Sequence, residues 1–317
     1  MDQDQTPGVD RRTLLTRCAG WAGSAAVYTL AGGLVSSVGI DAALAAGLKS
    51  GGGKAKPFTF VQISDTHLGF DKPANPNVHA TALQAVERIN ALPQQPDLIL
   101  HTGDITHLSK EAEFDDARQI LSGLRAPVFY VPGEHDYLDE GQGKAFLAHY
   151  GKGTQGNGWH SFDHGGVHFV ALNNVANLKP GGMAHLGEDQ IAWLKRDLSG
   201  LSASTPIVVF GHIPLWTVYE AWGWGTDDSA AALEQLRRFG SVTVLNGHIH
   251  QILHKVEGNV TFHSARSTAY PQPAPGAASS PGPLKVPTEQ LPSMLGIRSA
   301  RFVPGMSPIA LIDSSFA

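Results

Sequence analysis

Several short apolar segments of this 317-residue chain end directly in polar motifs rich in His, Asp and Gly, and this repeated pattern restricts the fold more than any other feature. Residues 58–63 read as a buried strand, residues 77–92 as a helix, and residues 96–104 as a second strand ending in Gly-Asp. A helix over 108–124 and a strand over 126–131 follow. Strands that alternate with helices predict βαβ units, whose parallel strands end at one edge of the sheet, where open α/β folds bind ligands.

After residue 151 the pattern changes to short strands around a turn, then a helix, then two more apolar strands. We predict these elements over residues 159–162, 167–172, 187–198, 206–210 and 242–245. From residue 270 the chain is rich in Pro, Gly and Ser and shows only a short helical pattern, with no second core. The sequence therefore predicts one α/β domain over 57–270 and a Pro/Gly-rich C-terminal extension over 271–317, packed on or near it.

Residues 1–45 have the composition of an export signal. Arg11 and Arg12 precede an uncharged stretch of small residues, and an Ala-Leu-Ala cleavage motif ends at residue 45. Leu14 stands where twin-arginine signals usually carry Phe. A membrane anchor is the alternative, but the many Gly, Ala and Ser residues make the stretch only mildly apolar and favour a cleaved twin-arginine signal.

Three expectations follow from a cleaved signal. The twin-arginine export machinery is a partner, the mature protein is periplasmic or secreted without a stable membrane anchor, and residues 46–56 form a Gly/Lys linker. Cys18, the sole cysteine, lies in the signal, so the mature chain has neither disulfides nor thiolate ligands. Removing four Asp and three Arg with residues 1–45 changes the net charge from −5 to −4, and this absence of a basic excess excludes nucleic acid as an expected partner.

The polar motifs at the strand ends share the side chains that bind hard and borderline metal ions. They contribute Asp65, His67, Asp104, Glu134, His135, Asp136, His212, His248 and His250. His248 and His250 are separated by one residue, and such a pair points the same way on an extended backbone. Each motif alone is typical of a turn or a buried histidine, but together they indicate a metal site of imidazoles and carboxylates.

These motifs resemble the five blocks of the calcineurin-like metallophosphoesterases. Asp-x-His matches at 65–67, Gly-Asp at 103–104, Gly-Asn-His-Asp/Glu at 133–136, Gly-His at 211–212 and Gly-His-x-His at 247–250. The resemblance covers about residues 58–264 and is closest to the exported bacterial, cyclic-nucleotide-phosphodiesterase-like branch. It implies a four-layer β-sandwich flanked by helices, with a binuclear site at the C-terminal ends of the strands.

The same resemblance implies a role for each candidate ligand and a reaction. The first ion is held by Asp65, His67 and His250, the second by Glu134, His212 and His248, and Asp104 bridges them. The cofactors are two divalent or mixed-valence ions of Mn, Fe or Zn. The reaction implied is hydrolysis of small organic phosphodiesters or phosphomonoesters by a metal-bound hydroxide.

Two neighbouring residues are expected to act in the chemistry. His135 would donate to a phosphate oxygen or protonate the leaving alkoxide. Asp136 would accept from the other nitrogen of the His135 ring and fix its tautomer. The alternative for Asp136 is a turn residue that caps the next helix.

Glu134 departs from the family pattern, which has Asn at this position. If Glu134 binds the second ion, it adds a third ligand carboxylate; if it is held away, the second site is weakened. The second possibility supports an alternative function, a catalytically weak metal- or ligand-binding protein on the same scaffold.

Other candidates have no fixed role from the sequence. His101 and His107 are expected to pack around the site rather than bind metal. The Trp-rich segment 216–224 is either a wall over the metals that stacks a nucleobase, sugar or aryl group, or a hydrophobic plug. Arg266 and Tyr270 could contact phosphate at the edge of the site, although nothing in their spacing requires it.

Overall fold

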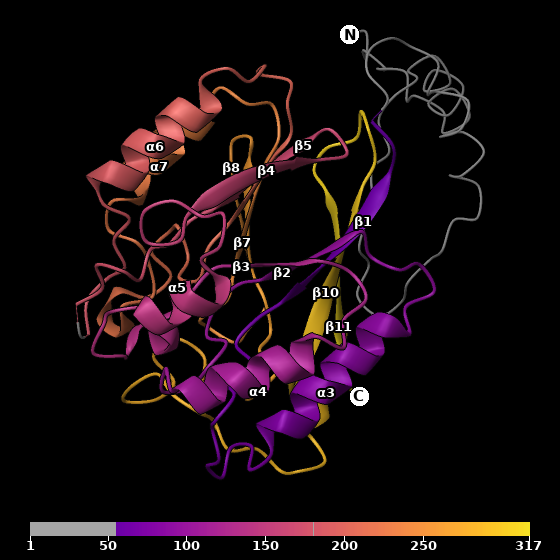
Figure 1. Cartoon of the computed structure of the whole chain (residues 1–317), viewed down its shortest axis with the longest axis vertical. Coiled ribbons are helices and arrows are strands. Elements are labelled where there is room, and N and C mark those ends of the chain that lie inside the picture. The colour runs from indigo at the N-terminus through magenta and orange to yellow at the C-terminus, as the bar shows by residue number, and fades with distance from the viewer. Residues whose placement is uncertain (1–54, 180) are drawn as a thin grey trace, which may run out of the picture. The chain divides into compact units, whose positions relative to one another are not determined.

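The computed structural model describes residues 55–179 and 181–317, and these form a two-sheet α/β structure (Figure 1). The predicted export signal over 1–45 and all but the last two residues of the predicted linker lie outside the described residues. Among the described residues, no helix combines the length and the apolar character needed to cross a membrane.

The first sheet has the strand order β11-β10-β1-β2-β3, with β1, β2 and β3 parallel as predicted. Its strands are β1 (Phe58–Ile63), β2 (Leu98–His101), β3 (Val128–Tyr130), β10 (Gly296–Phe302) and β11 (Ala310–Ser315). Helix α3 (Val78–Asn90) connects β1 to β2, and α4 (Glu111–Leu121) connects β2 to β3. The Asn77 side chain accepts a hydrogen bond from the Ala80 amide at 3.1 Å and so caps α3.

The second sheet has the order β4-β5-β6-β7-β9-β8, in which β5, β6, β7 and β9 are parallel. Its strands are β4 (His160–His164), β5 (Val167–Ala171), β6 (Ile207–Phe210), β7 (Val242–Asn246), β8 (Leu253–Glu257) and β9 (Val260–Ser264). Helices α6 (Glu188–Leu198) and α7 (Ser229–Leu236) pack on it. The remaining helices are α5 (Lys144–Tyr150), α8 (Leu291–Met294), η2 (Glu134–Tyr137) and η3 (Glu220–Trp222).

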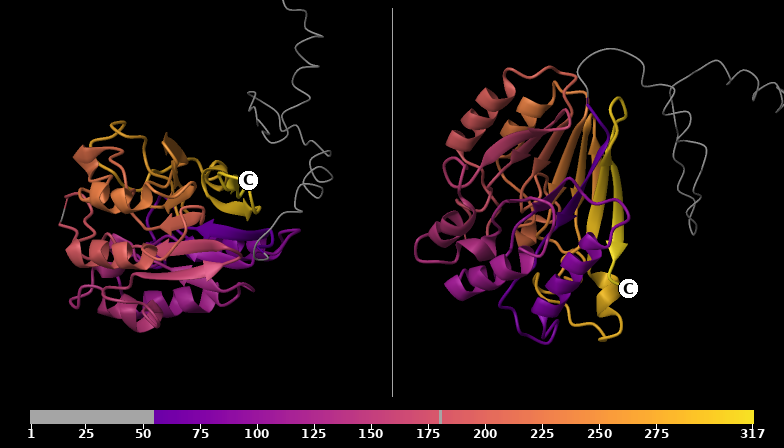
Figure 2. Two further views of the ribbon diagram at one scale, coloured as in Figure 1. Left: turned by 90° about the horizontal axis from the view of Figure 1, so that it is seen from above. Right: turned by 45° about the vertical axis from the view of Figure 1, so that its right-hand side comes forward.

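Three apolar layers hold four layers of secondary structure together. Between the sheets lie side chains such as Phe60, Phe169 and Val208, all buried completely. Helices α3 and α4 cover the outer face of the first sheet, and α6 and α7 cover that of the second, on opposite sides of the sandwich (Figures 1 and 2). Because strands such as β1 and β6 are buried on both faces, their sequences are nearly continuous apolar runs. The predicted four-layer sandwich is confirmed.

The C-terminal residues belong to the sandwich itself. Strand β10 pairs antiparallel with β1 along most of its length, and β11 pairs with β10 (Figure 1). Arg298 of β10 is buried and forms an ion pair with Asp313 at 2.9 Å, while its guanidinium also donates to Gln62 of β1 and to Ser264 of the second sheet. The boundary predicted at residue 270 therefore does not separate an extension from the domain, because the chain beyond it completes the first sheet.

Candidate metal centre

The predicted site residues come together at the carboxyl ends of the parallel strands of both sheets. Asp65 and His67 follow β1, Asp104 follows β2, and Glu134 follows β3. His212 follows β6, and His248 and His250 follow β7. Several groups of three ligand atoms form there, and two of them match the predicted ligand sets and take residues from both sheets. Either group is thus complete only when the two sheets pack together.

The first group consists of Asp65, His67 and His250, which are all buried. Nε2 of His250 lies 3.2 Å from Oδ1 of Asp65 and 3.3 Å from Nε2 of His67. The Asp65 carboxylate also accepts from the His248 amide at 3.1 Å, which ties the loop after β1 to the loop after β7. Burial and the charges of His135 and His250 lower the pKa of His67 well below its usual value, so its ring is neutral and can serve as a metal ligand.

The second group consists of Glu134, His212 and His248. The Glu134 carboxylate lies between the two imidazoles, with Oε2 at 2.8 Å from Nε2 of His212 and Oε1 at 2.9 Å from Nδ1 of His248. Burial favours protonation of Glu134, but His248 and then His212 oppose it and lower the pKa well below its usual value. The extra methylene of Glu relative to Asn therefore carries the carboxylate into the cluster, not away from it.

Asp104 lies between the two groups. Its Oδ2 is 3.2 Å from Nε2 of His212 and 3.5 Å from Nε2 of His67, and its Oδ1 accepts from the His135 amide at 2.9 Å. One carboxylate therefore faces an imidazole of each group. This is the position that the sequence analysis assigned to a bridging ligand.

The backbone at the cluster is left-handed at Asp65, His67, Asp104, His248 and His250, with φ between 41° and 70°. Non-glycine residues adopt this region rarely, and such strain gathers at functional sites. The expected extended backbone at His248 and His250 is therefore wrong: both lie beyond β7 in a loop, and their rings serve different groups. Gly247 permits the close approach, since a Cβ there would lie 2.0 Å from Oγ of Ser64.

The tautomers of two imidazoles indicate that the cluster needs a cation. Nδ1 of His212 lies 2.7 Å from the Thr102 carbonyl oxygen and Nδ1 of His250 lies 2.5 Å from that of Tyr270, so both Nδ1 atoms donate. In a neutral ring Nε2 then presents a lone pair, and here it faces a carboxylate. Burial opposes a charge on His212, but Asp104 and Glu134 outweigh it and raise its pKa well above the usual value. A metal ion bound between these atoms would also remove the repulsion between the Nε2 lone pair and the carboxylate.

Several atoms of the cluster also lack hydrogen-bond partners among the described residues although they are enclosed. They are Nδ1 of His67, Nε2 of His212, both ring nitrogens of His248 and Oε2 of Glu134. The contacts of Glu134 with the two imidazoles are short but lack hydrogen-bond geometry. Because enclosed polar atoms without partners are costly, this donor set fits two metal ions of the type that bind His and carboxylates.

The structure corrects the role predicted for Asp136. Its carboxylate accepts from the amides of Ile105, Thr106 and Gly133 at 2.8–3.0 Å and from the Thr106 hydroxyl, and it does not accept from the His135 ring. Instead, Nδ1 of His135 donates to the carbonyl oxygen of His107 at 2.6 Å. Asp136 therefore holds the loops after β2 and β3 together, since its carboxylate is the acceptor that four donors share.

The two histidines left outside the predicted ligand set lie close to the cluster. His101 is buried and its ring contacts the Thr66 hydroxyl at 3.1 Å, which agrees with a packing role. The His107 ring stacks on His135 with centroids 4.8 Å apart. With His67, the two rings form a third group of possible ligand atoms.

Strand β9 was missed from the sequence, and it delivers one more residue to the site. Tyr270 lies in the segment after β9 and its ring stacks on His67 with centroids 4.8 Å apart. The alternating Val260-Thr261-Phe262 run before a polar loop could have revealed this strand end. Arg266 is directed elsewhere, because its guanidinium donates to the Ser293 carbonyl.

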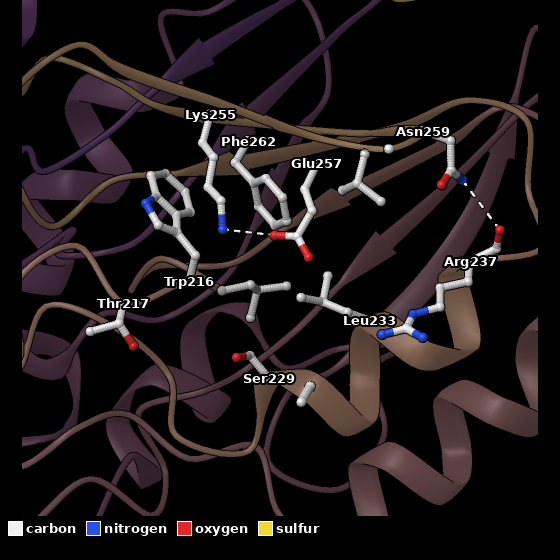
Figure 3. Close-up of a pocket in the computed structure, with 13 residues that line it drawn as sticks. Trp216, Thr217, Ser229, Leu233, Arg237, Lys255, Glu257, Asn259 and Phe262 are labelled. Atoms are coloured by element: carbon white, nitrogen blue, oxygen red, sulfur yellow. Dashed lines mark hydrogen bonds and ion pairs between the residues drawn. The ribbon is translucent and has the colours of Figure 1, made fainter.

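The Trp-rich segment 216–224 divides between two surroundings. Trp216 packs on Phe262, with centroids 5.2 Å apart, and lines a pocket of about 680 Å³ beside α7, β8 and β9 (Figure 3). Trp224 is fully buried 6.3 Å from the His248 ring, and half-buried Trp222 packs against it at 5.0 Å. Trp216 and Trp224 therefore fit the predicted hydrophobic plug, while the half-buried Trp222 fits the predicted wall beside the metal groups.

A sequence model of the calcineurin-like phosphoesterase family matches residues 58–252, more than half of the chain. The chain therefore belongs to this family, which confirms the resemblance drawn from the five motifs. The match ends before β8, β9, β10 and β11, so it covers the six residues of the two groups and also Asp104, but not Tyr270.

Named relatives refine this membership. A 3′,5′-cyclic-nucleotide phosphodiesterase of Nostoc is 26% identical over 68% of this chain and 79% of its own length. A glycerophosphodiester phosphodiesterase of Enterobacter lignolyticus is 26% identical over 67% and 77%. The crystal structure of a dimetal phosphatase from Danio rerio shares the fold with a TM-score of 0.60 at 13% identity, over 82% of this chain and 96% of that one. The protein is a metallophosphoesterase by family, fold and candidate metal groups.

Proposed function

We propose that this protein is an exported dimetal phosphoesterase that hydrolyses phosphodiester or phosphomonoester bonds of small organic substrates. The observation that carries the proposal is the pair of three-residue groups with Asp104 between them. A set of four imidazole and carboxylate ligands around each ion suits Mn, Fe or Zn. Asp65, His67 and His250 would hold one ion, Glu134, His212 and His248 the other, and Asp104 both.

The residues of the chain supply positioning and a proton. Two bound ions activate water and neutralise charge on the phosphoryl group. Burial opposes a charge on His135, but Asp104 and then Glu134 raise its pKa above the usual value. Since Nδ1 donates to the His107 carbonyl, the proton available for transfer is on Nε2. His135 would give it to a phosphate oxygen or to the leaving alkoxide.

Small substrates are supported by the names of the relatives and by the charge of the chain. The Nostoc relative is named for cyclic nucleotides and the Enterobacter relative for glycerophosphodiesters, both small diesters. The net charge of −5 also makes a polynucleotide a less favourable substrate.

Export is supported by the first 45 residues alone. Arg11 and Arg12 before a small-residue stretch would direct the chain to the twin-arginine machinery and then to the periplasm or the medium. Export of a folded protein by this route suits an enzyme that takes up metal beforehand. Replacing both arginines by Lys should leave the protein in the cytoplasmic fraction of a twin-arginine-competent bacterium, and unchanged export would contradict this part of the proposal.

The catalytic part is tested by assaying bis(p-nitrophenyl) phosphate and p-nitrophenyl phosphate with protein loaded with Mn, Zn, Fe or Co, with metal content measured on the same samples. Two ions per chain and hydrolysis of either ester support the proposal. Two ions without hydrolysis under any metal would instead support the catalytically weak binding protein. The position of Glu134 between His212 and His248 favours the enzyme, because the substitution that motivated the alternative still supplies a ligand.

A further inference from the structure

Tyr270 is an aromatic residue placed against the first metal group by the segment that follows β9. Its ring stacks on His67 at 28° and lies 4.8 Å from the His250 ring, between centroids. The Phe70 ring also packs against it, with centroids 4.3 Å apart, and only 3% of Tyr270 is exposed. The backbone carbonyl of the same residue accepts from Nδ1 of His250 at 2.5 Å. The residue is thus fixed at both its ring and its backbone.

The hydroxyl of Tyr270 is less constrained than its ring. It has no hydrogen-bond partner among the described residues, and it is not one of their enclosed polar atoms, so a small part of it remains accessible. A tyrosine hydroxyl carries its proton at neutral pH, so this one is a free donor on a ring that packs against His67 and His250 of the first group.

We propose that the Tyr270 hydroxyl donates a hydrogen bond to the phosphate group of the substrate, which makes Tyr270 a catalytic residue. The inference rests on the proposed function of the cluster, since it requires a phosphate beside the first group. The three carboxylates of the cluster offset much of the positive charge of two bound ions, so a neutral donor at its edge adds to the stabilisation of an anionic substrate. The proton stays on Tyr270, and no bond is formed or broken by it.

The test compares Tyr270→Phe with Tyr150→Phe. Tyr270→Phe keeps the ring on His67 and His250 and removes only the hydroxyl. Tyr150 is the control, because its hydroxyl also lacks a partner among the described residues but is enclosed away from the metal groups, and its ring packs in α5 against Tyr130, with ring centroids 4.2 Å apart. Both variants are loaded with metal and assayed for content, for kcat/KM with bis(p-nitrophenyl) phosphate, and for the dissociation constant of inorganic phosphate by calorimetry.

We expect Tyr270→Phe to bind two ions, to lose about tenfold or more in kcat/KM and to bind phosphate more weakly by a similar factor, because a hydrogen bond to a charged group is lost. Tyr150→Phe should match the unaltered protein in all three measurements. Equal values for the two variants would overturn the proposal, and so would loss of metal from Tyr270→Phe, which would make the hydroxyl part of the metal site. If the unaltered protein hydrolyses no ester, the proposed function fails, while the phosphate measurement still tests Tyr270.

Discussion

The two metal groups differ in how they are enclosed, although both are built across the same two sheets. The first is sealed: the side chains of Asp65 and His250 are 0% exposed, and Tyr270 covers two of its rings. The second is open on one side, with 24% of the Glu134 side chain and 12% of the His248 side chain exposed. We therefore expect the first ion to be retained more strongly and the second ion, which is nearer to solvent, to exchange faster.

The comparison depends first on Asp104, the residue that both groups share. Asp104→Asn keeps the size of the side chain and removes the charge that faces His67 and His212. Because two ions together contribute several kcal/mol to charge stabilisation, we expect kcat/KM to fall about 10³-fold. Metal analysis should show loss from both groups. Retention of two ions with normal turnover would remove Asp104 from the bridging position.

His248 and His250 provide a matched pair for separating the groups. His250→Ala should deplete the first ion and His248→Ala the second. Each variant should lose affinity for that ion by roughly 100-fold or more, since a direct ligand contributes more than the 10–100-fold of an outer partner. Metal content and competition with a chelator measure both. Loss of the opposite ion in either variant would reverse the assignment.

The strand-end motifs were predictable because two physical restrictions coincide. Parallel strands end at one edge, and few residue types bind metal, so Asp65, His67, Asp104, His212, His248 and His250 were identified by position and chemistry together. The left-handed backbone at five of the cluster residues was not predictable, because Asp and His, although enriched among non-glycine residues with positive φ, adopt it too rarely for their type alone to indicate it. That conformation also explains why the extended-strand argument for His248 and His250 failed.

Other features of the structure could not be predicted, because the sequence around their residues carries no distinctive pattern. Strand β10 carries Arg298 in its interior, which hides its apolar character, and only the structure supplies Asp313 and Gln62 as its buried partners. Asp136 has the residue type of a catalytic helper, but its four donors come from backbone and hydroxyl groups that sequence spacing cannot locate. The role of Tyr270 stayed undecided, because neither its residue type nor its spacing indicates that its ring packs on His67 and His250.

Glu134 tests whether the open group is held by a carboxylate. Glu134→Ala should lower the affinity for the second ion by roughly 100-fold, since a direct ligand contributes at least as much as an outer partner, and should leave the first unchanged, because of the two groups only the second contains this side chain. Glu134→Asn, which restores the family residue, should lose less. Binding of two ions by the Ala variant with unaltered affinity would take Glu134 off the ligand set.

Removal of the metals by a chelator tests how strongly each metal group is enclosed. On mixing two-metal protein with excess chelator, we expect two phases of equal amplitude, the faster by about tenfold, since exposed local structure opens at lower cost than sealed structure. The fast ion should be the one that His248→Ala already lacks. A single phase would mean that the two groups release metal together, and the contrast in exposure between Asp65 and Glu134 would then have no kinetic meaning.

The smallest expected effect concerns the wall beside the open group. Trp222 packs on Trp224, which lies next to His248, whereas Trp216 packs on Phe262 in the pocket beside α7. Trp222→Ala should raise KM about three- to tenfold for diesters with a large aromatic leaving group and change kcat little, because aromatic stacking contributes about 0.5–1.5 kcal/mol. Trp216→Ala, the control, should lower the melting temperature and leave KM unchanged. Equal KM changes in the two variants would show that the substrate does not approach along the open group, and the functional contrast between the two metal groups would be lost.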